Sequence, residues 1–207
     1  FFTLFYSILL FGCRSYSGSV SSAQVVENNE ELNAAVFNIS VENKESKNKY
    51  FDYNNSSPMP GVSFQKRWPI SKNKDFGVGL SLEESTVDLK YSLYSRDGLF
   101  ISISPVMVLP LYSLDKFDKY QINIVALGSL NVSNNLSIYT TYSLGYVPFN
   151  NSSKLYTQFS WGMMYGKDYG WVFNWLERKG TTKSNHHVNQ IGIGFFTSTL
   201  GKKLVSD

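Results

Sequence analysis

Apolar and polar residues alternate with a period of two along most of this 207-residue chain. Over residues 87–94, for example, every second residue is Val, Leu or Tyr, and the residues between them are mostly Asp, Lys or Ser. This period predicts β-strands, because successive side chains of a strand point to opposite faces. No segment keeps a helical period of 3.6 residues over three turns, so we expect almost no helix. The alternating runs are 34–42, 61–69, 76–84, 87–95, 99–109, 120–132, 136–147, 155–166, 171–179 and 188–199.

On these runs, the face opposite the large apolar residues is rich in Gly, Ser, Asn and Gln rather than in Lys and Glu. A soluble β-sandwich would present Lys and Glu to water. The crowded interior of a narrow barrel instead favours small polar side chains, while the apolar outer face meets lipid. Charged residues make up only 17% of the chain, against roughly 25% in ordinary soluble domains. The pattern therefore favours an all-β fold, an antiparallel up-and-down β-barrel of about 8 to 10 strands.

The predicted connections alternate between short turns and longer loops. Short turns at 71–74, 96–98, 133–135 and 167–169 contain the Asn, Asp or Gly that tight hairpins need. Longer loops at 43–60, 112–119, 148–154 and 180–187 fall at the opposite end, together with a brief link at 84–86. The first predicted strand starts at the short-turn end and the last one finishes there. Both chain termini are therefore expected at this end, as in bacterial outer-membrane barrels.

Over residues 34–199 this pattern resembles the small outer-membrane barrels of the OmpA, OmpX and OmpW type. The resemblance implies a barrel that spans the bacterial outer membrane, with aromatic residues near the strand ends at the two membrane interfaces. The polar tail at 200–207 departs from the terminal aromatic residue that is usual in these barrels. The candidates for the aromatic girdles are Trp68, Tyr94, Tyr112, Tyr146, Tyr165, Trp171 and Trp175.

The first twelve residues, FFTLFYSILLFG, form an apolar run of signal-peptide length that is too short to span a bilayer as a helix. Cys13 follows directly, which resembles the lipobox of bacterial lipoproteins and implies acylation of this cysteine, although Phe11 departs from the small residue usual there. Ordinary cleavage after Ala23 is the alternative, and both stay open. We expect a signal peptide over 1–12, a flexible lead-in over 13–33, the barrel over 34–199 and a polar tail over 200–207.

Five charged residues fall on the predicted inner face of the barrel: Arg67, Glu83, Asp88, Lys90 and Arg178. An unpaired charge in a low-dielectric interior costs several kcal/mol, so we expect these side chains to pair. A barrel of this size has little room for a channel. The charges therefore predict a structural plug rather than an ion path.

Catalytic chemistry has one candidate constellation, formed by Ser184, His186 and Glu177. A Ser, a His and a carboxylate are the groups of a nucleophilic hydrolase, but Ser and His in such a loop are more often simply solvated. One cysteine and two adjacent histidines do not supply a zinc site, and no cofactor motif is present. The net charge of +3 is too scattered for a nucleic-acid groove.

The sequence thus predicts a non-enzymatic outer-membrane barrel with a structural, adhesive or envelope-partner role, exerted through external loops and chiefly through 43–60. Its expected partners are membrane lipid and envelope proteins. A barrel hydrolase that modifies lipid A is the first alternative and would require Ser184, His186 and an acidic residue to converge at the outer rim. The second is a soluble, lipid-anchored periplasmic β-sandwich or barrel that binds a partner or small ligand, which would require an apolar face turned inward.

Overall fold

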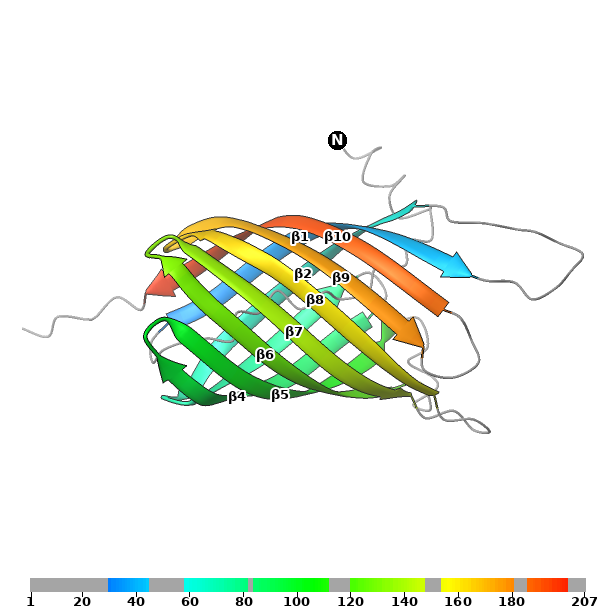
Figure 1. The fold of residues 1–207 in the computed structure, drawn as a ribbon, viewed down its shortest axis with the longest axis horizontal. Coiled ribbons are helices and arrows are strands. Elements are labelled where there is room, and N and C mark those ends of the chain that lie inside the picture. The colour runs from blue at the N-terminus through cyan, green and yellow to red at the C-terminus, as the bar shows by residue number, and fades with distance from the viewer. Residues whose placement is uncertain are drawn as a thin grey trace, which may run out of the picture.

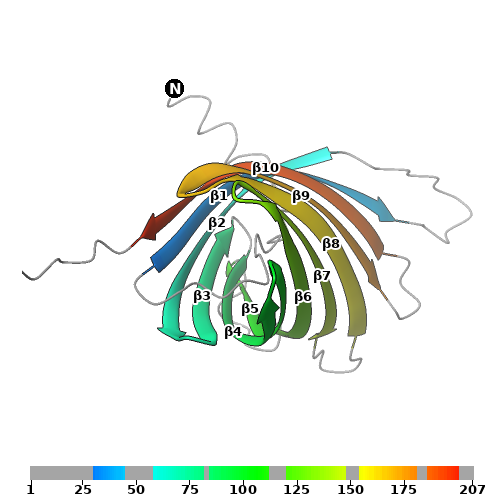
Figure 2. The ribbon, with the colours of Figure 1, turned by 60° about the vertical axis from the view of Figure 1, so that its left-hand side comes forward.

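The computed structural model describes residues 30–44, 58–81, 84–111, 120–147, 154–180 and 186–200. These residues form ten antiparallel strands that close into a barrel (Figures 1 and 2), in which strands adjacent in sequence pair with each other and β1 pairs with β10. The predicted fold class, an antiparallel up-and-down barrel, is confirmed. The strands are β1 (Glu30–Lys44), β2 (Pro58–Ser71), β3 (Lys74–Ser81), β4 (Glu84–Arg96), β5 (Leu99–Pro110), β6 (Gln121–Ser133), β7 (Leu136–Val147), β8 (Lys154–Gly166), β9 (Tyr169–Gly180) and β10 (His186–Leu200).

Most strand bounds lie close to the alternating runs, but the third strand differs. A strand over 76–84 and a link at 84–86 were expected, and this placement is wrong because β3 ends at Ser81 and Glu84 already begins β4. The Ser81 hydroxyl accepts a hydrogen bond from the Glu84 N–H at 3.1 Å and donates one to the Glu84 carbonyl at 3.1 Å. These two bonds join the ends of the two strands and place the connection at 82–83.

The barrel is closed by β1 and β10, which pair over all fifteen residues of each strand. The register runs from Glu30 across from Leu200 to Lys44 across from His186. Residues 30–33, expected in the lead-in, therefore belong to β1. Closure gives each strand two neighbours, as a sheet in hydrocarbon requires, because lipid offers no partner to an open edge.

The tight hairpins lie at one end of the barrel, at the left in Figure 1. Two-residue turns at 72–73, 97–98, 134–135 and 167–168 occupy the predicted positions. Asp97 and Gly98 have φ angles of 53° and 79°, as in a type I′ hairpin turn, which has positive φ at both central positions, and Asp and Gly tolerate this conformation. The start of β1 and the end of β10 lie at the same end. We call this the turn end, and the opposite end the loop end.

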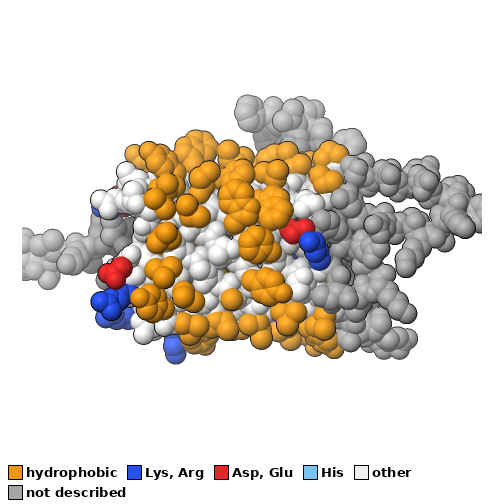
Figure 3. Space-filling model, viewed as in Figure 1, with side chains coloured by type: hydrophobic (Ala, Val, Ile, Leu, Met, Phe, Trp, Pro, Cys, Tyr) orange, Lys and Arg blue, Asp and Glu red, His pale blue; other side chains and the backbone are white. Residues whose placement is uncertain are grey.

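Large apolar side chains cover the outer face of the barrel. Figure 3 shows hydrophobic side chains across the described wall and charged side chains towards its two ends. Phe64, Leu93, Ile124, Trp171 and Ile193 are each more than half exposed. So much exposed apolar surface is unusual in water, and it is the surface that a lipid-embedded barrel presents. The apolar face is thus turned outward, and the soluble alternative required it to turn inward.

The expected aromatic girdle forms at the turn end, where Trp68, Tyr94, Tyr165 and Trp171 lie close to the hairpins. Tyr146 lies next to the loop end of β7, and Tyr112 lies outside the described residues. The girdle position expected for Trp175 is wrong. Because β9 runs from Tyr169 to Gly180, Trp175 lies in the middle of the strand, across from Trp161.

Replacing Ile193 by Lys should destabilise the barrel in lipid by about 2–4 kcal/mol, the cost of Lys near the midplane on a lipid-facing strand. Ile193 lies at the middle of β10 and is 56% exposed. Equilibrium unfolding of the barrel, refolded in phospholipid vesicles, measures the change. Tyr169→Lys, at the turn end, is the control and should cost only about 0–1 kcal/mol. Equal costs at the two positions would contradict the membrane placement.

Candidate functional site in the barrel interior

Four charged side chains meet inside the barrel, and we call them the ionic cluster: Arg67 of β2, Asp75 of β3, and Asp88 and Lys90 of β4. The strand register explains how they reach one another. Arg67 lies across from Gly77 of β3, and Gly77 lies across from Asp88. Because Gly77 has no side chain, the guanidinium of Arg67 extends over β3, into space that a Cβ at Gly77 would need.

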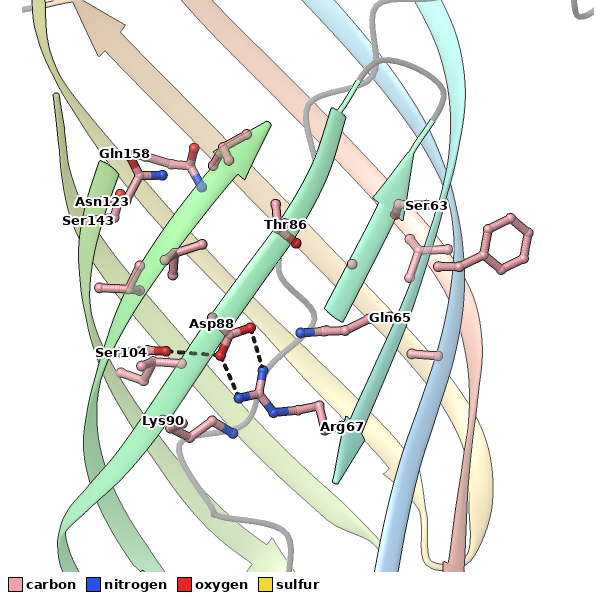
Figure 4. Close-up of a pocket in the computed structure, with 18 of the residues that line it drawn as sticks. Ser63, Gln65, Arg67, Thr86, Asp88, Lys90, Ser104, Asn123, Ser143 and Gln158 are labelled. Carbon is pink, nitrogen blue, oxygen red and sulfur yellow. Dashed lines mark hydrogen bonds and ion pairs between the residues drawn. The ribbon is translucent and has the colours of Figure 1, made fainter. Parts of the chain in front are cut away.

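Arg67 binds both carboxylates of the ionic cluster. Its Nη1 donates to Asp88 Oδ2 at 3.0 Å and its Nη2 to Asp88 Oδ1 at 2.6 Å, a bidentate pair (Figure 4). Its Nε donates to Asp75 Oδ1 at 2.9 Å, and its Nη2 also bonds that oxygen. Lys90 Nζ lies 3.5 Å from Asp75 Oδ2, and Ser104 of β5 donates to Asp88 Oδ1 at 3.0 Å. The pairing thus links four neighbouring strands.

The ionic cluster is buried and carries no net charge. Its side chains are at most 8% exposed, and two cations balance two anions. Desolvating four charges is costly, and their mutual pairing offsets this cost only while the set is complete. The arrangement therefore suits a fixed structural element.

The lumen wall on the far strands is packed with apolar side chains. Val36, Met164, Val172 and Phe196 form one buried group with Tyr139. Tyr139 lies across from Gly162 of β8, and its ring lies where a side chain at Gly162 would lie. A large side chain set against a glycine on the neighbouring strand fills the interior here, as Arg67 and Gly77 do on the opposite wall.

Towards the loop end the lumen holds a second polar group around Tyr156 of β8. The Tyr156 hydroxyl hydrogen-bonds to Asn123 Oδ1 at 2.5 Å and Gln121 Oε1 at 2.8 Å. Arg178 of β9 lies over the Tyr156 ring, 4.5 Å from its centroid, and its Nε donates to Gln158 Oε1 at 3.1 Å. Aromatic stacking and a hydrogen bond hold the Arg178 guanidinium against the wall.

The cavity between these groups is small, with a volume of about 50 Å³. This volume holds a few water molecules, whereas small-molecule sites occupy about 300 Å³ or more. The Gln65 Oε1 and Ser143 Oγ atoms line the cavity without a hydrogen-bond partner among the described residues, and water suits such positions. The described side chains around this cavity thus leave room for water but not for a small-molecule ligand.

Three of the five predicted interior charges come together, namely Arg67, Asp88 and Lys90. Arg178 is separate from them, and Glu83 lies outside the described residues. The sequence analysis missed Asp75 and Glu84, which are 0% and 6% exposed. Asp75 falls between the predicted turn 71–74 and the predicted strand 76–84, and Glu84 falls at the end of that strand. Extending the alternation of β3 back by one residue from Phe76 places Asp75 on the inner face.

The hydrolase constellation is not assembled by the described residues. Glu177 shares the outward alternation of Trp171, and its Oε1 lies 2.9 Å from Lys179 Nζ. Ser184 and the side chain of His186 lie outside the described part of the structure, as does Cys13, and these roles stay predictions. Across the described ranges, no three His, Cys, Asp or Glu side chains gather as a metal site, and no helix is long and apolar enough to cross a bilayer.

No protein-family model and no curated protein matches the chain. The solved structures similar to it include small outer-membrane β-barrel proteins. Ail, the attachment invasion locus protein of Yersinia pestis, is 9% identical over 83% of this chain and 99% of its own, with a TM-score of 0.41. The NanC porin is 6% identical over 78% and 98%, with a TM-score of 0.47. Neisserial surface protein A is 11% identical over 81% and 96%, with a TM-score of 0.38.

Replacing Asp88 by Ala should destabilise the barrel by about 3–5 kcal/mol, because the ionic cluster would keep an uncompensated buried cation. Equilibrium unfolding in vesicles measures the change. The double variant Arg67→Met with Asp88→Ala removes both charges and should recover part of the loss. If the double variant loses the sum of the two single losses, the two residues are not energetically coupled.

Proposed function

We propose that this chain is a non-enzymatic barrel of the bacterial outer membrane that serves a structural, adhesive or envelope-partner role through its loop end, rather than as an open channel. The filled interior is the observation that carries the proposal. The ionic cluster is neutral and fixed by bidentate pairing, and the cavity beside it has a volume of about 50 Å³. A solute-conducting barrel needs a continuous aqueous path wider than this.

The membrane location is supported by the wall of the barrel. Closure by β1 and β10 leaves no open sheet edge, and the outer face is apolar while the inner face carries the buried polar side chains. This combination is the architecture of outer-membrane barrels. Short turns face the periplasm in such barrels, so the turn end of this chain is assigned to the periplasmic side and the loop end to the cell exterior.

The external role is assigned to the loop end. The connection between β1 and β2 belongs to this end, and residues 45–57 of it lie outside the described part of the chain. A filled barrel with rigid walls is a suitable scaffold for such segments, because binding residues on a protein tend to lie on connections held by a fixed framework. Envelope proteins and surface ligands are the partner classes that this placement fits.

The purified barrel should be heat-modifiable and should not conduct. Unheated and heated samples from the outer-membrane fraction should differ in gel mobility, and planar lipid bilayers containing the folded barrel should show no stable conductance steps. The double variant Arg67→Ala with Asp88→Ala should conduct measurably, because it empties part of the lumen. Stable steps from the unmodified barrel would contradict the plugged interior, and recovery in the soluble fraction without a mobility shift would contradict the membrane location.

Replacing residues 45–57 by a short Gly-Ser linker should abolish the external role while leaving the barrel intact. The measurement is complementation of a strain that lacks the protein, scored by envelope permeability and by surface adherence, with heat-modifiability as the check on folding. The matched control replaces the turn 134–135 by Asn-Gly, which alters the periplasmic end. Full complementation by the linker variant would exclude this loop as the functional surface.

A further inference from the structure

A groove runs along the outer face of the barrel over β10, β1, β2 and β3. Its floor is Ala35 of β1, which lies in register between Phe195 of β10 and Phe64 of β2. The small side chain between two phenylalanines leaves a depression, which Val78 and Leu80 of β3 extend. The groove has a volume of about 380 Å³, within the size range of small-ligand sites.

The groove is polar at its turn end only. Lys66 of β2 lies in register with Asn33 of β1. Asn33 precedes Ala35 by two residues and so lies on the same outer face. Lys66 Nζ lies 2.9 Å from Glu31 Oε2, with both side chains 43% exposed, and 5.1 Å from the ring centroid of Trp68. The groove therefore has an apolar body and a mouth that carries one positive and one negative charge, at the height of the aromatic girdle.

We propose that this groove binds a zwitterionic phospholipid of the ethanolamine type, one molecule per barrel. An acyl chain lies along Ala35 between the two phenylalanines, the phosphate pairs with Lys66, and the ammonium group pairs with Glu31. The inference rests on the proposed membrane location and on the turn end facing the periplasmic leaflet. Exposed ion pairs such as Lys66–Glu31 are weak, so each partner can exchange to the lipid headgroup.

Charge complementarity decides between headgroups. A purely anionic headgroup would gain the attraction of Lys66 but would meet the Glu31 carboxylate beside it. A zwitterionic headgroup presents one charge of each sign, as the Lys66–Glu31 pair does. Trp68 lies beside this mouth, and Trp side chains favour the headgroup level of a bilayer.

Native mass spectrometry of the full chain, released from mild detergent with added lipid, tests the apolar part of the groove. The unmodified barrel should retain one phosphatidylethanolamine and should bind it at least tenfold more tightly than phosphatidylglycerol with the same acyl chains. Ala35→Phe fills the groove and should weaken this retention at least tenfold. The matched control is Ala126→Phe, an exposed alanine on the outer face of β6, across the barrel from β1, which should bind as the unmodified chain does.

Variants of the two charged residues, Glu31 and Lys66, test the mouth of the groove. Glu31→Gln should lose the preference for phosphatidylethanolamine by binding phosphatidylglycerol more tightly, whereas Lys66→Gln should weaken the binding of both lipids. A general effect of net charge would change only the binding of the anionic lipid, so weaker binding of the net-neutral phosphatidylethanolamine by Lys66→Gln distinguishes a local contact with the phosphate. Lys179→Gln is the matched control, because Lys179 forms the same kind of exposed pair with Glu177 at 2.9 Å, away from the groove.

Three results would overturn the proposal: equal retention of the two lipids by the unmodified barrel, unchanged retention in Ala35→Phe, or equal losses in Ala35→Phe and Ala126→Phe. A species of twice the chain mass that Ala35→Phe removes would assign the groove to a second copy and overturn the lipid site as well. Heat-modifiability of every variant distinguishes failure of the lipid site from failure of the proposed membrane location. A heat-modifiable barrel that fails the lipid test refutes the groove site alone, whereas a chain without the mobility shift refutes the membrane barrel.

Discussion

Closure of the sheet is the constraint on which the rest of this structure depends. Hydrocarbon offers no hydrogen-bond partner, so every backbone donor and acceptor must be bonded within the wall. The fifteen-residue pairing of β1 with β10 meets this requirement where an open sheet would fail. Closure also divides the side chains of each strand between lipid and lumen. A slip of one residue would exchange the two faces, so the clean alternation and the closed register support each other.

The lumen shows how a narrow barrel accommodates large polar side chains. Three bulky residues each lie across from a glycine on the next strand: Arg67 from Gly77, Tyr156 from Gly145, and Tyr139 from Gly162. In each pair the larger side chain occupies the space that the glycine leaves. The glycines of the inner face are therefore the counterparts of specific neighbours. This packing fills the interior without adding unpaired charge.

The strands could be predicted from the sequence because alternation is a local signal, and the tight turns could be predicted from Asn, Asp and Gly. The ionic cluster could be predicted only in part. Arg67, Asp88 and Lys90 stand on the inner face of clear runs, whereas Asp75 stands beside a turn and its role depends on the register of β2, β3 and β4. The outer groove could not be predicted at all, because Ala35 becomes a groove floor only when Phe64 and Phe195 come to lie on either side of it. Pairing between distant segments carries this information, and periodicity does not.

The ionic cluster and the closing seam differ in the length of chain that each must bring together. Arg67 is 8 residues from Asp75 and 21 residues from Asp88, so the cluster can assemble as soon as β2, β3 and β4 meet. Across the seam, by contrast, Ser40 bonds Gln190 at 3.0 Å over a separation of 150 residues. Contacts close in sequence have a smaller loop-closure entropy to overcome than distant ones. Pairing within the β2–β4 meander therefore has a smaller entropic cost than the closing seam, which must bring together the first and the last strand of the barrel.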